Sequence, residues 1–493
     1  MTDLIVTTTS GQVRGVRSGE VGRFLGVPYA AAPVGPLRFA APAGAAWPGV
    51  RDATQPGPNA PHNVRAFPGL DIEPLIGKGW IPGDDYLNLN VWTRDPADKG
   101  QPVMVFIHGG AFTLGSGLAP VQDGTAFARS GIVLVTINYR LGVDGFLAIP
   151  GAPTNLGLRD QIAALAWVRS NAAAFGGDPR NITVFGESAG AMSIADLVAS
   201  PLAQGLFAKA IIQSGHGSMV RSIPVTQRLT RKIAKAAKIT PNLAGFRALD
   251  VPQTIAAVDA AQAPTFQVDL RDRSGREPAY GLSKFLPVYG DDVLPDHPLE
   301  ALAKGVGADI HVLIGANAEE MNLYFVPTGV RETVNGLLAR SLVGRSIRRA
   351  GAILKAYGLG RAGAKAGEVM TRAMSDLVFR HPARRFAAAH KGRTHLYDFA
   401  WRSPAAGGQL GACHGIEMPF VFNNLAVCAG PQGLAGEAPP QALADAVHAI
   451  WVNFAAKGEL PWPEYEPGAR QVYALASGTA GVDPDMPAAI FDA

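Results

Sequence analysis

Short apolar runs alternate with longer stretches of helical periodicity along most of the chain, which is typical of an α/β protein. The strongest strand candidates are residues 86–92, 103–107, 133–138, 182–185, 210–213, 311–314 and 395–399. Helical periodicity is clearest over residues 155–174 and 443–454. Because strands that are separated by helices pair in parallel, we expect a large, mostly parallel central sheet covered by helices on both faces.

The N-terminal part has a different pattern. Short β-prone segments at residues 6–9, 12–16 and 23–27 are separated by turns, and a proline-rich loop follows to about residue 80. We therefore expect a small N-terminal β region before the main sheet. Length alone would allow about two to four domains, but no repeat, charge block or low-complexity linker divides the chain. A single domain over residues 1–493 is the preferred interpretation.

Composition narrows the setting in which the protein works. The longest apolar runs, such as residues 132–137, are far too short to span a bilayer. The N-terminus has neither the basic region nor the long apolar region of a secretory signal. The chain has only two cysteines, Cys413 and Cys428, whereas secreted chains of this size usually carry several. These features predict a cytoplasmic protein without stable membrane insertion.

Neither the motifs nor the charge distribution of the sequence indicate a binding site for a metal, a nucleotide or a nucleic acid. No Cys/His spacing resembles a zinc site, and no Gly-rich phosphate-binding loop of the G-x-x-x-x-G-K-[ST] type occurs. The net charge is only +4, but residues 331–393 contain 14 Lys or Arg against 3 Asp or Glu. No aromatic interleaving or nucleic-acid motif accompanies them, so we interpret this stretch as helices with solvated outer faces.

The most informative motif is Gly-Glu-Ser-Ala-Gly at Gly186–Gly190, which lies between an apolar run and a helix-prone run. By itself the G-x-S-x-G pattern arises by chance in roughly one chain in four of this composition. A strand before it and a helix after it, however, are typical of a nucleophile elbow. Ser188 would then lie at a helix N-terminus, where free N–H groups favour developing negative charge. Ser188 is therefore the predicted nucleophile.

A serine nucleophile needs a histidine base, which follows both the serine and the acid in this architecture. The histidines of the last third of the chain are His381, His390, His395, His414 and His448. His414 alone lies in a long glycine-rich loop, residues 407–415, from which a side chain can project over a sheet edge. It is the predicted base.

The acid is expected at the end of a strand between the serine and the histidine. Glu319 and Glu320 follow the strand candidate at residues 311–314, and Asp291 and Asp292 form a rival pair. Spacing alone does not choose among these four carboxylates.

The sequence also contains a candidate oxyanion hole, a set of N–H groups that would stabilise a developing alkoxide. The apolar run at residues 103–107 is followed by Gly109 and Gly110, whose backbones are sterically open. The N–H of Ala189, directly after Ser188, is a third candidate donor.

Several longer motifs extend over nearly the whole chain. They are FLGVPYA from Phe24, PVGPLRF from Pro33, DYLNLNV from Asp85, HGGAF from His108, NYRLG from Asn138, NLGLRDQ from Asn155, FGGDPRNITVFGESAG from Phe175, QSG from Gln213, GACHGIEMPF from Gly411 and WVNFA from Trp451. With these motifs the chain resembles the type B carboxylesterase/lipase family of α/β-hydrolases, and most of all its bacterial p-nitrobenzyl-esterase-type members.

This resemblance implies an α/β-hydrolase fold and a serine esterase that forms an acyl-enzyme. It places the family's nucleophile on Ser188, its histidine on His414 and its acid on Glu320, the fifth residue after the strand-end Gly315. The implied oxyanion-hole donors are Gly109, Gly110 and Ala189. It implies a small-molecule ester substrate, no metal or cofactor, no nucleic-acid partner, and a monomer or small homo-oligomer.

The chain departs from the family pattern at three places. Tyr86 stands where many members have a cysteine, so the loop at residues 57–83 is not stapled and its part in the pocket rim stays open. Met321 replaces the usual glycine after the acid, and residues 287–291 replace the usual Pro-x-x-Asp-Gly run. The same triad could act on carbamates, amides or thioesters. Non-catalytic binding relatives typically lack the serine or the histidine, and this chain has both.

Overall fold

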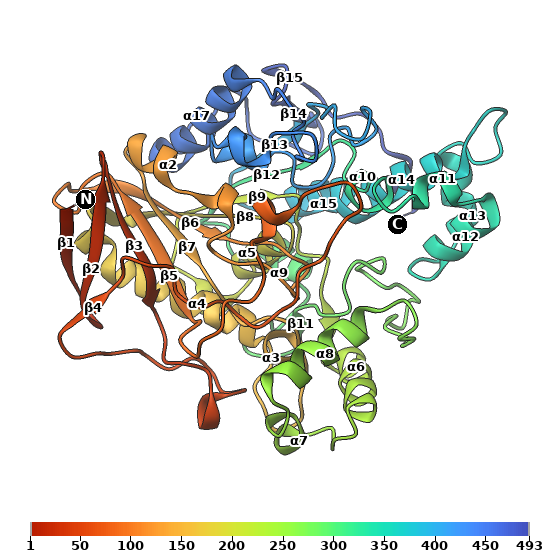
Figure 1. Ribbon diagram of the computed structural model, residues 1–493. Helices are drawn as coiled ribbons and strands as arrows, with labels where there is room; N and C mark the ends of the chain where they lie inside the picture. The colour runs from red at the N-terminus through yellow and green to blue at the C-terminus, as the bar shows by residue number, and fades with distance from the viewer. Residues whose placement is uncertain (1, 492–493) are drawn as a thin grey trace.

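A single mixed sheet runs through the molecule (Figure 1). The computed structural model describes residues 2–491. The sheet strands are β1 (Thr2–Thr8), β2 (Gly11–Ser18), β3 (Val21–Pro28), β4 (Val50–Asp52), β5 (Asn88–Thr93), β6 (Gln101–Ile107), β7 (Val133–Ile137), β8 (Gly177–Glu187), β9 (Lys209–Gln213), β12 (His311–Asn317), β13 (Thr394–Phe399), β14 (Gln471–Ala474) and β15 (Thr479–Val482). A separate parallel pair joins β10 (Arg221–Ser222) to β11 (Val288–Tyr289).

The centre of the sheet is parallel. Its spatial order is β1-β2-β3-β5-β7-β6-β8-β9-β12-β13-β14-β15, with β4 paired to β2. All strands from β7 to β14 in this order pair in parallel, whereas β1, β2, β3 and β5 form an antiparallel N-terminal region that continues onto β7. All seven strand candidates and the N-terminal β region are confirmed.

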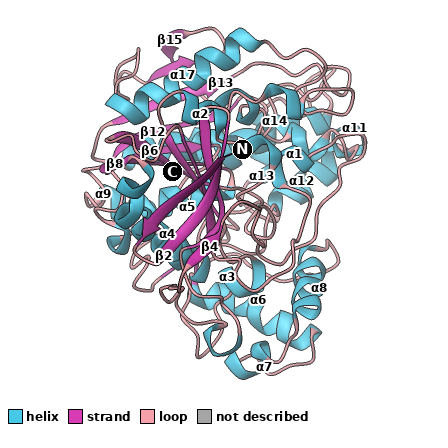
Figure 2. Ribbon diagram, turned by 60° about the vertical axis from the view of Figure 1, so that its left-hand side comes forward, coloured by secondary structure: helices cyan, strands magenta, loops and turns pink. Residues whose placement is uncertain are grey.

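Helices cover both faces of the sheet (Figure 2). They are α1 (Glu73–Ile76), α2 (Thr125–Arg129), α3 (Gly142–Phe146), α4 (Leu156–Asn171), α5 (Ala189–Val198), α6 (Ile223–Ala236), α7 (Leu243–Arg247), α8 (Val251–Gln262), α9 (Pro298–Ala303), α10 (Asn322–Phe325), α11 (Val330–Thr333), α12 (Gly336–Gly344), α13 (Ala350–Ala356), α14 (Ala366–Ser375), α15 (His381–Ala389), α16 (Met418–Val421) and α17 (Gln441–Lys457). A π-helical turn at Asp376–Arg380 joins α14 to α15. The two predicted helices are confirmed as α4 and α17.

The sheet separates two hydrophobic cores. Along β6, Val103, Val105 and Ile107 belong to one core, and Met104 and Phe106 belong to the other, because successive strand residues point to opposite faces. Helices α4 and α5 contribute to the first core, and α2 and α17 contribute to the second. This two-sided burial explains why the central strands appear in the sequence as continuous apolar runs. In the part of the chain that the structure describes, no helix could cross a membrane.

Candidate active site

Ser188 lies at the sharp turn between β8 and α5. Its backbone has φ 55° and ψ −124°, a conformation that non-glycine residues rarely adopt and that stores strain. An added Cβ at Gly190 would lie 1.9 Å from the carbonyl oxygen of Ile107, and one at Gly186 would lie 2.6 Å from the same oxygen. Both glycines are therefore required because β6 passes directly beside the turn.

The carboxylate of Glu320 holds the imidazole of His414. Glu320 Oε2 lies 2.7 Å from Nδ1 of His414, and Glu320 Oε1 accepts the backbone N–H of Asn317 at 2.7 Å. The backbone N–H of His414 also donates to the carbonyl oxygen of Glu320 at 3.2 Å. Glu320 is completely buried just beyond β12, so the carboxylate and the ring are fixed by both side-chain and backbone contacts.

The neighbouring Glu319 points in another direction. Its carboxylate pairs with Arg402, and it accepts the backbone N–H of Ala412 at 3.0 Å. It therefore braces the loop that precedes His414 without touching the imidazole.

The rival acids and the other histidines also lie elsewhere. Asp291 accepts hydrogen bonds from the side chains of Thr154 and Asn155, and Asp292 pairs with Arg159. Three histidines have partners outside this site: His390 contacts Thr394, His395 contacts His311, and His448 contacts the carbonyl oxygen of Val421. Among the four candidate carboxylates, it is Glu320 whose side chain contacts the ring of His414.

The glycine loop after β6 lies against the serine turn. An added Cβ at Gly109 would lie 3.0 Å from the Cβ of Ser188, and Gly110 has φ 112°, which favours glycine. Among residues 2–491, neither Gly109 nor Gly110 donates its N–H to an acceptor. The N–H of Ala189, as the first residue of α5, has no acceptor in the preceding turn of the helix. Three candidate donors thus surround Ser188.

Glu187 is a carboxylate at this site to which the sequence analysis gave no role. Its Oε1 lies 3.0 Å from Nε2 of His414. Burial raises the pKa of Glu187 to about 8. Within residues 2–491, Nε2 of His414 has no hydrogen-bond partner, so the Ser188 hydroxyl is not bonded to it. Such catalytic contacts are often long in ligand-free enzymes. One sequence feature could have indicated a role for Glu187: it is a carboxylate at the end of an apolar strand, directly before the predicted nucleophile.

The charge state of His414 follows from its carboxylate neighbours. Burial alone would lower the pKa of His414, but the charges of Glu187 and Glu320 outweigh burial and raise this pKa to about 9. Protonation of Glu187 removes one of these charges, so the titrations of the two groups are linked.

A further carboxylate, that of Glu417, lies close to Glu320. Glu417 accepts hydrogen bonds from the side chains of Asn317 and Gln213 at 2.6 and 3.1 Å, and burial raises its pKa. Trp451 in turn donates to Gln213 at 3.1 Å. Since the backbone of Asn317 also binds Glu320, this network connects the acid to the opposite core of the sheet.

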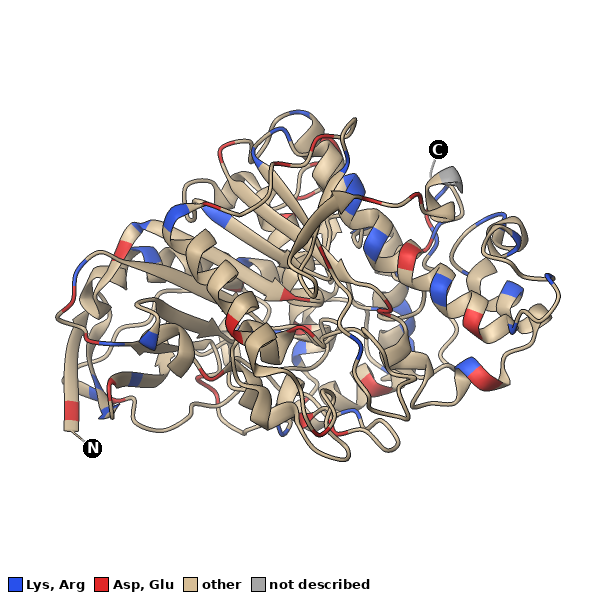
Figure 3. Ribbon diagram, turned by 90° about the horizontal axis from the view of Figure 1, so that it is seen from above, with Lys and Arg blue, Asp and Glu red and all other residues tan. Residues whose placement is uncertain are grey.

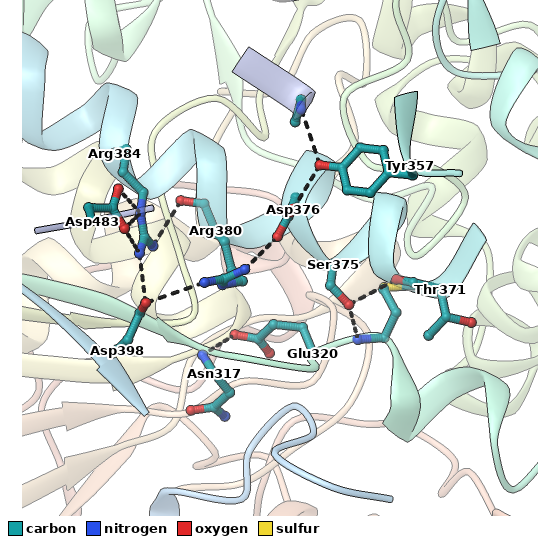
Figure 4. A network of polar contacts seen from close by, with 12 residues as sticks. Asn317, Glu320, Tyr357, Thr371, Ser375, Asp376, Arg380, Arg384, Asp398 and Asp483 are labelled. Atoms are coloured by element: carbon teal, nitrogen blue, oxygen red, sulfur yellow. Dashed lines mark hydrogen bonds and ion pairs between the residues drawn. The ribbon is translucent and has the colours of Figure 1, made fainter. Parts of the chain in front are cut away.

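A second network lies beside Glu320 (Figure 4). It runs through Asp483, Arg384, Asp398, Arg380, Asp376 and Tyr357. The network ties the π-helical turn to β13. On that turn, the ring of Phe379 packs 4.6 Å from the ring of His414, so the network also supports the histidine.

Ser188, His414, Glu187 and the glycine loop line one cavity of about 90 Å³. Its walls are mostly apolar. Five of its residues come from the loop at residues 57–83, namely Arg65, Phe67, Ile72, Leu75 and Ile76. An outer hollow of about 500 Å³ shares Arg65, Phe67, Leu114 and Tyr324 with this cavity. The unstapled loop therefore does form part of the pocket and its rim.

A model of the carboxylesterase family matches residues 2–483. The chain belongs to the carboxylesterase family. The resemblance to type B carboxylesterases is thereby confirmed, and this esterase is a carboxylic ester hydrolase with the α/β-hydrolase fold.

Individual members of the family align over nearly the full chain. The para-nitrobenzyl esterase of Bacillus subtilis (strain 168) is 36% identical over 499 residues, covering 97% of this chain and 96% of the relative. The fumonisin B1 esterase of Sphingopyxis macrogoltabida is 33% identical over 486 residues, covering 94% and 85%. A solved carboxylesterase structure from Geobacillus stearothermophilus superposes with a TM-score of 0.82 at 33% identity, covering 97% of this chain and 98% of that one.

Two of the three departures from the family pattern occupy buried positions in this esterase, whereas residues 287–291 run from buried Pro287 to exposed Gly290. Tyr86 and Met321 are both buried, and both cysteines, Cys413 and Cys428, are buried free thiols. The N–H of Met321 donates to the hydroxyl of Ser375 at 3.1 Å. The side chain that replaces glycine after the acid is thus packed into the core, away from solvent.

Proposed function

We propose that this esterase is a serine carboxylesterase in which Ser188, His414 and Glu320 form the catalytic triad. The observation that carries the proposal is the 2.7 Å contact between Glu320 and Nδ1 of His414, beside a serine in a strained turn of the same cavity. Glu320 holds the tautomer that leaves Nε2 free to accept a proton, and stabilises the imidazolium that forms.

In the proposed mechanism, Ser188 Oγ attacks the ester carbonyl carbon while Nε2 of His414 takes the serine proton. The tetrahedral intermediate collapses, and His414 gives that proton to the departing alcohol. A water molecule, deprotonated by His414, then attacks the carbonyl carbon of the acyl-enzyme. The second tetrahedral intermediate collapses to the carboxylic acid, and His414 returns the proton to Ser188 Oγ. The balance requires only ester and water, so the proposal includes no metal or cofactor.

The N–H groups of Gly109, Gly110 and Ala189 are the proposed oxyanion-hole donors. The loss of a single such donor typically costs about 10²–10³ in kcat. Their fixed backbone positions need no reorganisation when the oxyanion forms.

The proposed substrates are small, neutral carboxylic esters. A cavity of about 90 Å³ is far smaller than the pockets of about 300–1,000 Å³ that hold drug-sized ligands, and it suits a short acyl group. Its apolar walls favour uncharged substituents, and the outer hollow offers room for the alcohol part of the ester. Relatives named for para-nitrobenzyl and fumonisin B1 esters support ester hydrolysis as the shared chemistry.

A panel of p-nitrophenyl esters of increasing acyl length tests this proposal, together with the corresponding anilides and carbamates. Wild type should hydrolyse short esters fastest, and Ser188→Ala should lose almost all activity. Ser170→Ala, at an exposed position on α4, is the matched control and should behave as wild type. Equal rates for wild type and Ser188→Ala contradict the mechanism. Turnover of the carbamates or anilides alone contradicts the substrate class.

The proposal further treats residues 1–493 as one domain, in the cytoplasm, as a monomer or small homo-oligomer. One sheet that contains strands from both ends of the chain supports the single domain, and two buried free thiols support a reducing compartment. Calorimetry tests the single domain, and separate unfolding transitions would contradict it. Cell fractionation tests the location, and recovery of the protein from the medium would contradict it. Light scattering tests the oligomeric state, and large assemblies would contradict it.

A further inference from the structure

Residues 336–365 contain seven basic side chains and no acidic one. These are Arg340, Arg345, Arg348, Arg349, Lys355, Arg361 and Lys365. The segment therefore carries +7, and all other residues together carry −3. Lys365 pairs with Glu368, but the other six side chains are exposed and have no carboxylate within 4 Å among residues 2–491. This concentration of positive charge is not neutralised by the fold.

The outer face of α12 combines this charge with apolar surface. Leu337 is 77% exposed and Leu338 is 44% exposed. At 100° per residue, Leu337 lies about 60° from Arg340 around the helix axis, and Leu338 lies about 20° from Arg345, the residue just after α12. Both leucines point away from the buried Ala339 and Val343. A large apolar side chain on a monomeric surface needs no explanation alone, but two adjacent ones inside a cationic face form an amphipathic surface.

The segment is firmly attached to the body of the protein. Figure 1 shows α12 and α13 at the edge of the molecule, next to α14, and Figure 3 shows Lys and Arg on the helices at this end. Ile353 and Leu354 of α13 are buried, and the Tyr357 hydroxyl donates to Asp376 at 2.7 Å in the network of Figure 4. The cations and leucines are thus presented on a fixed support that connects through α14 to the turn beside His414.

We infer that residues 336–365 form a docking surface for anionic lipid bilayers. Clusters of four to eight Lys or Arg attract anionic headgroups, and the two leucines can enter the boundary between headgroups and acyl chains. A nucleic acid would match the charge but offers no partner for the leucines, and the one aromatic ring of the segment, Tyr357, has its hydroxyl bound inside the protein. Apolar surface within the cationic face therefore favours lipid.

This docking is peripheral and independent of the proposed catalytic mechanism. It would hold the esterase at a surface where esters with apolar parts accumulate, which raises their local concentration near the enzyme. The interaction depends on both charge and apolar contact, and each contribution can be removed separately.

Vesicle flotation tests the proposal directly. The full chain should float with vesicles of phosphatidylcholine and phosphatidylglycerol, and should stay in solution with vesicles of phosphatidylcholine alone. High salt should release it, because screening weakens attraction at an exposed surface. Absence of binding to the anionic vesicles at low salt overturns the proposal.

Two variants and one control separate the contributions. Arg340→Gln/Arg345→Gln/Arg349→Gln should lower the partition coefficient by about 100-fold, at about fivefold per charge. Leu337→Ser/Leu338→Ser keeps the charge and should lower it by about tenfold. All variants should hydrolyse a soluble ester at the wild-type rate, which shows that they fold.

The control removes the same charge elsewhere. Arg231, Lys235 and Lys238 are exposed on and just after α6, a helix with no exposed large apolar side chain. Replacement of all three by Gln should change vesicle binding by less than about threefold, since the sites lie away from the docking surface. An equal loss in this control assigns binding to net charge and overturns the proposal. The proposal is also overturned if Leu337→Ser/Leu338→Ser binds the vesicles as wild type does and wild type binds duplex DNA more tightly than the vesicles. That result would assign the surface to a nucleic acid.

Discussion

The carboxylate of Glu320 lies 2.7 Å from Nδ1 of His414, whereas the adjacent Glu319 carboxylate pairs with Arg402. Two consecutive glutamates thus point in different directions from the same turn after β12. The carboxylate of Glu320 is enclosed between β12 and the His414 loop, and that of Glu319 reaches a partly solvated edge. Their substitution by Gln therefore has unequal consequences.

Glu320→Gln should lower kcat by about 10³–10⁴, because an amide at Nδ1 favours the wrong tautomer and leaves the imidazolium without its counter-charge. Glu319→Gln should lower kcat by less than about tenfold, since it loses only a charged contact to a loop. Steady-state kinetics with a p-nitrophenyl ester measure both. The reverse order of effects would show that Glu319 is the acid.

The activity should rise with pH, with the rise controlled by Glu187. His414 acts as a base only when it is neutral, and Glu187 and Glu320 together raise its pKa to about 9. Glu187→Gln removes one of these charges, so the pKa of His414 falls and the rise in kcat/KM moves to lower pH. The ratio of kcat/KM at pH 7 to that at pH 9 measures this shift without depending on the absolute rate.

The matched control for the pH profile is Glu319→Gln, which should leave its midpoint unchanged. An unchanged midpoint in Glu187→Gln would mean that the 3.0 Å contact between Glu187 and His414 does not exist in solution.

The central sheet could be predicted because its strands are buried on both faces and therefore appear as uninterrupted apolar runs. The last two strands, β14 and the edge strand β15, could not, since they are short and β15 is fully exposed along its length. No apolar period distinguishes such strands from loops. Helix α6 was not predicted although the sequence carries its signals: Val225, Leu229 and Ile233 are buried at every fourth position, and a proline lies in the first turn.

At the site, chain order and local motifs were enough to predict Ser188 as the nucleophile and His414 as the base from the sequence. They could not choose between Glu319 and Glu320, because side-chain direction in a turn depends on what packs around it. The contact of Glu187 with His414 was not predicted for a related reason. The closeness of Glu187 to His414 results from a loop more than two hundred residues away in sequence, and no local period encodes that approach.

The glycine at position 190 is expected to be indispensable for folding. A Cβ at Gly190 would lie 1.9 Å from the carbonyl oxygen of Ile107 and 2.8 Å from that of His108, so β6 or α5 must move. Gly190→Ala should destabilise the protein by more than about 4 kcal/mol, the range of exceptional substitutions. Gly468→Ala, where an added Cβ meets nothing within 4 Å, should change the unfolding free energy by less than about 0.5 kcal/mol.

Chemical denaturation followed by tryptophan fluorescence measures both glycine variants. Wild-type stability of Gly190→Ala would show that the serine turn relaxes freely, which the strained backbone of Ser188 argues against.

The buried ion pairs around Arg384 should matter much more than a surface pair of the same type. Arg384 donates to Asp483 at 2.8 Å and to Asp398 at 2.7 Å, and Arg384 and Asp483 are both buried. Arg384→Met leaves the Asp483 carboxylate buried without its cation, which should cost about 3–5 kcal/mol. Arg393→Gln breaks an exposed pair with Glu464 and should cost less than about 1 kcal/mol.

A double variant provides a test that a simple packing defect would fail. In Arg384→Met/Asp483→Asn the carboxylate left without its cation is replaced by a neutral amide, so part of the lost unfolding free energy should be recovered. Chemical denaturation of wild type and of both variants measures this recovery. A double variant no more stable than Arg384→Met would indicate lost side-chain packing as the cause, and would remove the buried carboxylate from the explanation.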